Sequence, residues 1–361
     1  MFNLFNDKRI SAFGLDLSDS SIKVMQLERK NGIVLPRAYS SGPVPTGVIA
    51  NHQIAQMDKL ADIIRYAVSA ARNVNTKYVV ASVPETKSFV RVLTVPKMEQ
   101  TEIADALPWE LEQDIPVPID QVYMDWQMIR ETDDKYEVLV TATPRDYADA
   151  IIDTLKSAGY TPVALELESQ ATARALIKPG NTAGAVLLAD ISGAMTSFVI
   201  VADGNILEYT SSIPIGGGSF TESIARSLGV SQSEAEKMKR EKGLLSETKK
   251  GNIRQALLPI LDNIVDEIKS VVRFYEEHAA PGQGIDRVLL CGGGSKLSGI
   301  ADYISARLNL GADKPIGRVQ LGDAGMNLFG DAAGKQPAKE DFLSYTTAIG
   351  LALRGLDYEI D

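Results

Sequence analysis

Acidic and hydroxyl side chains that could bind a metal and a nucleotide occur where a predicted buried strand ends. Asp16 is followed at short spacing by Ser18, Ser20, Ser21 and Lys23. A carboxylate at a strand end can hold Mg²⁺ through water, and the backbone N–H groups of a small-residue turn can face phosphate. A lysine close behind can reach a terminal phosphate as a point charge. The same residues are also typical of an ordinary hairpin turn, so this segment alone is a weak signal.

A second segment repeats this order later in the chain. Asp190 ends another predicted strand and is followed by Ser192, Gly193 and Thr196. Two such segments facing each other would bind a triphosphate and its metal from both sides, and a chance match would have to occur twice. We therefore predict that these residues bind the phosphates of ATP, and that Asp16 and Asp190 hold Mg²⁺ through water.

Two glycine runs could bring the backbone close to the same nucleotide. One opens a predicted helix, whose N-terminus favours an anion, and the other connects a buried strand to a helix. The residues that we include in the predicted site are Gly216, Gly217, Gly218, Gly292, Gly293, Gly294, Ser295 and Lys296. A simple strand-to-helix turn explains the first run equally well.

A helix after the first glycine run carries an acidic and a basic residue on one face. Glu236 and Lys239 are three residues apart and could bracket a ribose. Taken singly, such a pair is more often a solvated salt bridge. The other common nucleotide motifs are missing, since the sequence contains neither G-x-x-x-x-G-K-[ST] nor an early G-x-G-x-x-G.

Composition excludes several other classes of function. The chain has 361 residues, a formal net charge of -10, one cysteine and two histidines. The acidic balance disfavours nucleic acid as a partner, and a single cysteine fits a reducing compartment. Histidine-rich metal sites are nearly excluded, and no window has the roughly 20 apolar residues of a membrane span. We expect a cytoplasmic protein whose first residues, Met1 to Arg9, form a tail and not a signal peptide.

The order of predicted elements indicates a duplicated α/β fold. Strands ending near Asp16 and near Asp190 are each followed by a small turn and two further strands, the second set at Phe198–Val201 and Ile206–Ile213. A segment at 85–163, predicted to be a ββαββα-type subdomain, interrupts the first lobe. We expect the first lobe at 1–180, with its core at 1–84 and 164–180, and the second at 181–341. The second lobe contains a helical subdomain at about 229–283, and a C-terminal helix at 342–361 returns to the first lobe.

Taken in order, these motifs resemble the nucleotide-binding motifs of the actin/Hsp70/sugar-kinase superfamily. The resemblance implies a two-lobed actin-like ATPase fold that binds ATP and Mg²⁺. It assigns Glu168, at the start of a short helix, to positioning the attacking water. It also makes Tyr345–Ala352 a second connecting helix, in which Ala348 and Gly350 allow close helix crossing.

Within this superfamily the chain resembles the PilM family of type IV pilus assembly proteins, which are FtsA-like. The resemblance is carried by the inserted segment and two later motifs: Val95–Met98, Trp109–Gln113, Ile115–Asp120, Gly216–Thr221 and Glu234–Lys237. The chain departs from the superfamily at Ser18 and Ser192, where glycine is usual. A Cβ there could crowd a phosphate, so the resemblance implies ATP binding with at most slow hydrolysis.

The resemblance implies a cytoplasmic adaptor of the inner-membrane pilus assembly platform that is peripheral to the membrane through its partners. It would bind the N-terminal cytoplasmic tail of PilN in a groove between the first lobe and the inserted subdomain. We expect Trp109 or Leu111 to line this groove or, preferably, its supporting core. Self-association stays open.

Two other functions fit the same fold. An FtsA-like division protein usually ends in a basic amphipathic helix, whereas this chain ends in the acidic segment Arg354–Asp361. A small-molecule kinase or ATPase would need a further catalytic aspartate and a substrate pocket of its own.

Overall fold

The computed structural model describes residues 9–50, 52–112, 115, 117–180, 184–202, 206–244, 247–248, 251–279, 283–309, 317–329, 342–356 and 358–359. Within these ranges the chain divides into two compact units. Unit 1 comprises Met1–Glu28, Pro36–Glu168 and Leu351–Asp361, and unit 2 comprises Arg29–Leu35 and Ser169–Gly350. Of the predicted N-terminal tail, Met1 to Arg9, only Arg9 lies within the described residues.

Unit 1 is built on a five-stranded sheet in the order β11-β7-β2-β3-β4. The strands are β2 (Phe13–Leu17), β3 (Ser21–Lys30), β4 (Ile33–Pro43), β7 (Tyr78–Val83) and β11 (Thr161–Leu167). β2 pairs antiparallel with β3 and parallel with β7, and β7 pairs parallel with β11. Short pairs are formed by β1 (Arg9–Ile10) with β19 (Tyr358–Glu359), and by β5 (Ile49–Ala50) with β6 (Gln53–Ile54).

Two helices complete the core of unit 1. α1 (Met57–Ala70) buries Leu60 and Ile64 at helical spacing, and α3 (Arg145–Ser157) buries Ile151 and Leu155 in the same cluster as β2 and β7. Because this apolar face packs against the core sheet, α3 belongs to the core and not, as expected, to an inserted segment at 85–163.

The inserted subdomain is a three-stranded antiparallel sheet covered by one helix. Its strands are β8 (Phe89–Pro96), β10 (Lys135–Pro144) and β9 (Val122–Glu131), in that order. α2 (Gln100–Leu111) covers the sheet with Ile103, Leu107 and Leu111. The expected ββαββα order counts two strands before the first helix. Only β8 belongs to this sheet, since the strand before it, β7, pairs in the core sheet.

Unit 2 repeats the strand order of unit 1. Its sheet runs β18-β17-β12-β13-β14, matching β11-β7-β2-β3-β4. β12 pairs antiparallel with β13 and parallel with β17, and β17 pairs parallel with β18, as do β2 with β3 and β7, and β7 with β11. The strands are β12 (Ala185–Ile191), β13 (Thr196–Ala202), β14 (Ile206–Ile213), β17 (Ile285–Cys291) and β18 (Arg318–Leu321). The predicted duplication is therefore present at the level of topology.

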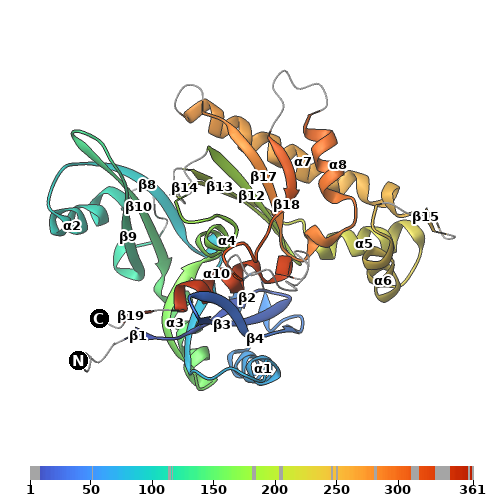
Figure 1. Ribbon diagram of the computed structural model, residues 1–361, viewed down its shortest axis with the longest axis horizontal. Helices are drawn as coiled ribbons and strands as arrows, with labels where there is room; N and C mark the ends of the chain where they lie inside the picture. Colours follow the sequence, from blue (N-terminus) through green and yellow to red (C-terminus); the bar gives the residue numbers. More distant parts are fainter. Residues whose placement is uncertain are drawn as a thin grey trace. The chain divides into compact units, whose positions relative to one another are not determined.

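Helices and short elements surround this second sheet (Figure 1). The helices are α5 (Gly217–Leu228), α6 (Gln232–Lys242), α7 (Ile253–His278) and α8 (Ile300–Leu308). A short hairpin joins β15 (Glu247–Thr248) to β16 (Gly251–Asn252). α7 contributes a long apolar face, including Leu257, Leu261 and Ile264, to the core of unit 2. None of the described helices combines the length and apolarity needed to cross a membrane.

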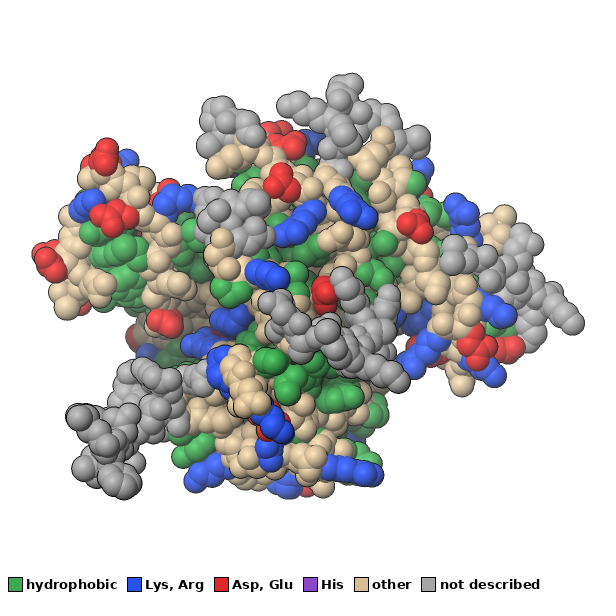
Figure 2. All heavy atoms as spheres, viewed as in Figure 1, with side chains coloured by type: hydrophobic (Ala, Val, Ile, Leu, Met, Phe, Trp, Pro, Cys, Tyr) green, Lys and Arg blue, Asp and Glu red, His purple; other side chains and the backbone are tan. Residues whose placement is uncertain are grey.

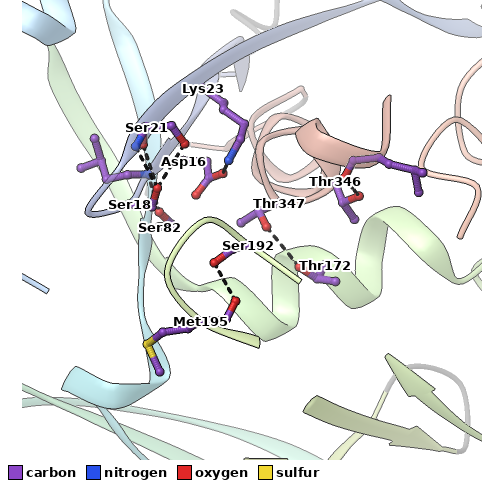
Figure 3. Close-up of polar contacts among 12 residues, drawn as sticks. Asp16, Ser18, Ser21, Lys23, Ser82, Thr172, Ser192, Met195, Thr346 and Thr347 are labelled. Carbon is purple, nitrogen blue, oxygen red and sulfur yellow. Dashed lines mark hydrogen bonds and ion pairs between the residues drawn. The ribbon is translucent and has the colours of Figure 1, made fainter. Parts of the chain in front are cut away.

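The boundary between the units lies after residue 168, whereas the sequence predicted it after residue 180. The contacts of a connecting helix explain the difference. α4 (Glu168–Leu176) from Ser169 onward packs in unit 2 with the first half of α10 (Thr346–Gly355), residues 346–350. The Oγ1 atoms of Thr172 and Thr347 are hydrogen bonded at 3.2 Å (Figure 3). A Cβ added to Gly350 would lie 1.8 Å from the carbonyl oxygen of Ala171. Glycine is therefore needed at position 350 for these helices to pack so closely.

Candidate functional site

The first phosphate loop, residues 16–21, begins with an ion pair between adjacent strands. Asp16 on β2 lies directly opposite Lys23 on β3. Asp16 Oδ2 and Lys23 Nζ are 2.7 Å apart, and Asp16 is only 5% exposed. The lysine thus neutralises a buried carboxylate. In this structure the Lys23 amine lies on Asp16, where the sequence predicted a contact to phosphate.

A serine closes the turn of this loop. The N–H and the Oγ of Ser18 both donate to the carbonyl oxygen of Ser21, each at 3.0 Å. The Ser21 N–H in turn donates to Ser18 Oγ at 3.2 Å (Figure 3). The Val44 N–H holds the loop from outside by donating to the Ser20 carbonyl at 3.0 Å. The Ser18 side chain is therefore folded into its own turn.

The second phosphate loop, residues 190–196, is closed in the same way. The N–H and the Oγ of Ser192 both donate to the carbonyl oxygen of Met195, at 2.9 and 3.0 Å (Figure 3). At the end of the loop, Thr196 is buried and its Oγ1 donates to the Ile215 carbonyl at 2.7 Å. Both serines that replace the expected glycines thus make the same pair of hydrogen bonds.

The surroundings of Asp190 differ from those of Asp16. Ser197, not a lysine, lies opposite Asp190 on the neighbouring strand. The carboxylate lies against the second glycine run, since a Cβ added to Gly292 would be 2.2 Å from Asp190 Oδ1. Complete burial, and then the charge of Asp190 and a hydrogen bond with it, raise the pKa of the Cys291 thiol well above its usual range.

The first glycine run supports the second phosphate loop. The N–H groups of Gly217 and Gly218 donate to the carbonyl oxygens of Ser192 and Gly193, both at 2.8 Å. A Cβ added to Gly216 would lie 2.7 Å from the Ser192 carbonyl oxygen. The sequence predicted that the start of α5 would attract an anion. Its first two amides instead donate to protein carbonyls, and the glycines permit this close approach.

The second glycine run follows β17 and packs under the end of β12. Gly292 has a φ of +80°, and its N–H donates to the Leu343 carbonyl at 2.9 Å. A Cβ on Gly294 would lie 2.4 Å from the Ile191 side chain. Ser295 is buried and donates to the Gly292 carbonyl at 2.7 Å. Gly293 and Lys296 are exposed and thus present the surface of the run to solvent.

Glu236 and Lys239 form a network that joins α6 to the first glycine run. Lys239 Nζ lies 2.6 Å from Glu236 Oε2 and donates to the Gly217 carbonyl at 2.8 Å. Thr221 also donates to Glu236, at 2.5 Å, as does Arg240, at 2.6 Å. Burial alone would raise the pKa of Glu236, but the hydrogen bonds from Lys239, Thr221 and Arg240 lower it to about 2. This pair is more than a solvated salt bridge, because it contacts the glycine backbone.

Unit 2 therefore brings together most of the predicted nucleotide residues. The second phosphate loop, both glycine runs and the Glu236–Lys239 pair form one continuous set of contacts, closed by the approach of Gly217 to Gly294. Unit 1 carries the first loop and Glu168, the residue at the start of α4. Among the described residues, no three His, Cys, Asp or Glu side chains are grouped so that they could hold a metal ion.

A pocket of about 550 Å³ lies within unit 1, where the core meets the inserted subdomain. Its walls come from four separate stretches of chain. The lining residues are Gln53, Thr86, Lys87, Phe89, Val117, Asp120, Gln121, Pro144, Arg145, Asp146 and Tyr147. No local pattern in the sequence marks these lining residues, because only the fold brings them together.

Neither Trp109 nor Leu111, the two residues expected at the partner groove or in its supporting core, lines this pocket. Leu111 is 2% exposed and packs in the core of the inserted subdomain, in agreement with the preferred expectation. Trp109 is 77% exposed, so the role in the supporting core is wrong for it, and it is not among the residues that line this pocket. Figure 2 shows hydrophobic side chains between charged ones on the surface of the inserted subdomain.

Comparison with known proteins identifies relatives over nearly the whole chain. A family model described as type IV pilus assembly protein PilM matches residues 14–356. The solved structure of a PilM–PilN type IV pilus biogenesis complex has a chain that is 26% identical to this one. The match has a TM-score of 0.80 and covers 97% of this chain and 100% of that chain.

Two more distant structures share the fold. The ethanolamine utilization protein EutJ from Carboxydothermus hydrogenoformans is 17% identical, with a TM-score of 0.58, over 95% of this chain and 89% of its own. MreB5 of Spiroplasma citri bound to ADP is 14% identical, with a TM-score of 0.54, over 96% of each chain. These similarities confirm the predicted actin-like ATPase fold class.

Proposed function

Since this chain belongs to the PilM family of type IV pilus assembly proteins, we propose that it is an ATP-binding adaptor that binds the N-terminal cytoplasmic tail of PilN. Its place is the cytoplasmic side of the inner-membrane assembly platform, which it reaches through this partner. The observation that carries the proposal is the continuous set of contacts in unit 2 among the second phosphate loop, the two glycine runs and Glu236–Lys239.

In this proposal, residues of unit 2 bind the ribose and the base of the nucleotide. Glu236 and Lys239 hold the ribose, and the exposed backbone at Gly293 lies along the base. Within unit 2, the serine-closed loop 190–196 would face phosphate, and the Asp190 carboxylate would hold Mg²⁺ through water, a role suited to an acidic oxygen ligand. Within unit 1, the serine-closed loop 16–21 and the Asp16 carboxylate are proposed to have the same roles. The bound nucleotide of the MreB5 structure supports a nucleotide as ligand for this fold.

Hydrolysis is at most slow in this proposal. Both loop hydroxyls are used within their own turns, as shown by the bonds from Ser18 to Ser21 and from Ser192 to Met195. Glu168, at the start of α4, is the residue proposed to orient a water molecule. ATP then serves to favour one conformation of the adaptor, and its binding energy biases partner binding.

The pocket of unit 1 is the proposed site for the PilN tail. Phe89, Val117 and Pro144 supply apolar surface, and Lys87 and Arg145 supply positive charge. Arg145 is held in place, because its Nε donates to the Asp120 carbonyl at 2.9 Å and its guanidinium lies 4.3 Å from the centre of the Tyr123 ring. An extended segment with apolar side chains and a carboxylate fits these groups.

A binding assay with pocket variants tests this assignment. We expect a labelled peptide of the PilN N-terminal tail from the same organism to bind the wild-type protein, as measured by fluorescence anisotropy. Phe89→Asp should weaken binding at least about tenfold, because it places a charge in the apolar wall. Trp109→Ala, which changes an exposed aromatic residue outside the pocket, is the matched control. Equal losses for the two variants, or no loss for Phe89→Asp, would overturn the assignment.

A further inference from the structure

A chain of polar contacts runs from the first phosphate loop to the pocket, entirely within unit 1. Asp19 sits in the loop between Ser18 and Ser20. Its carboxylate accepts the backbone N–H of His52 at 3.1 and 3.4 Å, and its Oδ1 lies 3.5 Å from His52 Nδ1. Both side chains are about one-fifth exposed, at 22% for Asp19 and 19% for His52. A contact that is largely shielded from water is a firm link between two backbone segments.

His52 directly precedes a residue of the pocket wall and so connects Asp19 to the pocket. It has a φ of +57°, a conformation that residues other than glycine adopt at a cost. The Asp19 carboxylate stabilises this backbone by accepting the His52 N–H. The next residue, Gln53, lines the pocket and begins β6. The position of Gln53 in the wall therefore depends on where the loop holds Asp19.

Two other residues that line the pocket are affected by charges of the first phosphate loop and its contacts. Burial raises the pKa of Tyr147, and the charges of Glu168 and Asp19 raise it further. Burial lowers the pKa of His52, Asp19 opposes that shift, and Lys87 adds to it. Tyr147 and Lys87 both line the pocket. The Asp19 carboxylate is thus close enough to influence Tyr147 in the lining and His52 beside it.

We propose that the contact between Asp19 and His52 couples the pocket to the first phosphate loop, so that a peptide in the pocket and a Mg-nucleotide strengthen each other's binding. This inference rests on the proposed function and adds its regulation. A peptide that fixes Gln53 also fixes His52, Asp19 and the turn that Asp19 belongs to. A nucleotide that orders the turn fixes the same residues from the other end. The cost of ordering them is then paid by the first ligand, which gives positive coupling that is equal in both directions.

The coupling is measured as a ratio of two affinities. The dissociation constant of the labelled PilN tail peptide is determined by fluorescence anisotropy, with and without saturating Mg-ATP, on the full chain. For the wild type we expect Mg-ATP to tighten peptide binding at least about fivefold. The reciprocal titration, Mg-ATP binding with and without saturating peptide, should give the same factor.

Three variants test whether this contact carries the coupling. Asp19→Ala removes the acceptor for the His52 N–H, and we expect the ratio to fall to about one. Asp19→Asn keeps an acceptor oxygen at this position and should retain most of the ratio. Asp105→Ala, which removes an equal charge from the exposed face of α2, is the matched control and should keep the wild-type ratio.

A second measurement separates coupling from simple loss of stability. Peptide binding in the absence of nucleotide should slow amide hydrogen exchange across residues 16–21 in the wild type and in Asp19→Asn, but not in Asp19→Ala. A wild-type ratio near one, or full coupling in Asp19→Ala, would overturn the inference while leaving both binding sites in place. Failure of the peptide or of Mg-ATP to bind alone would instead overturn the proposed function, and this inference with it.

Discussion

The two phosphate loops have the same turn but different surroundings for their aspartates. In each, a serine N–H and hydroxyl donate to the carbonyl oxygen three residues ahead. Asp16 is paired with Lys23 across two strands, whereas Asp190 lies against Gly292 and Cys291. A duplicated topology thus preserves the backbone of the loop, while the role of the carboxylate is free to differ.

The largest expected effect comes from removing the charge of Asp16 in the first phosphate loop. Asp16→Ala should weaken Mg-ATP binding at least about a hundredfold, because it removes a proposed metal-facing carboxylate and leaves the partly buried Lys23 without that counter-charge. Isothermal titration calorimetry measures this, with circular dichroism to check the fold. An unchanged affinity in a folded variant would mean that the nucleotide site does not include Asp16.

The next largest effect should come from the packing in unit 2. Gly294→Ala places a Cβ 2.4 Å from the Ile191 side chain and 2.9 Å from its carbonyl oxygen, and should lower the free energy of unfolding by about 1–3 kcal/mol. Thermal or urea denaturation measures the loss. Gly293→Ala is a control from the same run, since its nearest contact would be an ordinary 4.0 Å. Equal stability for the two variants would contradict the packing role of this run.

A smaller, pH-dependent effect is expected at Glu236. Its pKa in the folded protein is lowered from 4.5 to about 2, so the carboxylate stabilises the fold when it is charged. This stabilisation is complete above about pH 5 and is lost as the pH falls from about 4.5 towards 2. The melting temperatures of the wild type and of Glu236→Gln should therefore differ at pH 7, and the difference should shrink from about pH 4.5 and disappear towards pH 2. A difference that does not change with pH would exclude this electrostatic account.

The smallest expected effects test the similarity of the two turns. Ser18→Ala and Ser192→Ala both remove a hydroxyl-to-carbonyl hydrogen bond, which should cost about 0.5–1.5 kcal/mol of stability. Ser18→Ala also removes the acceptor of the Ser21 N–H and should lie at the upper end of this range. Chemical denaturation of the two variants gives the comparison. Losses that differ by much more than this range would show that the two loops are not equivalent in their backbone support.

The sequence predicted the parts of this site that depend on local order along the chain. Strand ends at Asp16 and Asp190, the glycine runs and the helical pair Glu236–Lys239 all have periodic or compositional signals. Side-chain geometry has no such signal. The hydroxyls of Ser18 and Ser192 donate within their own turns, which depends on their rotamers. The approach of Asp190 to Gly292 depends on packing between distant segments.

The lining of the pocket and the division into units also depend on tertiary contacts that have no local signal in the sequence. The pocket is formed by stretches around residues 53, 86–89, 117–121 and 144–147, which only the tertiary fold brings together. The sequence predicted a boundary between residues 180 and 181, but the contacts of α4 assign Ser169 and the residues after it to unit 2. A turn signal marks where the chain can bend, and the contacts made by the neighbouring helix decide to which unit it belongs.

The most direct test of the central claim compares ATP binding with ATP turnover. Calorimetry gives the affinity for Mg-ATP, and a coupled phosphate-release assay gives steady-state hydrolysis with and without the PilN tail peptide. An adaptor should bind both ligands and hydrolyse ATP slowly, at well below about one turnover per second, which is the lower end of typical enzyme rates. Rapid hydrolysis without the peptide, or no binding of Mg-ATP, would contradict the account.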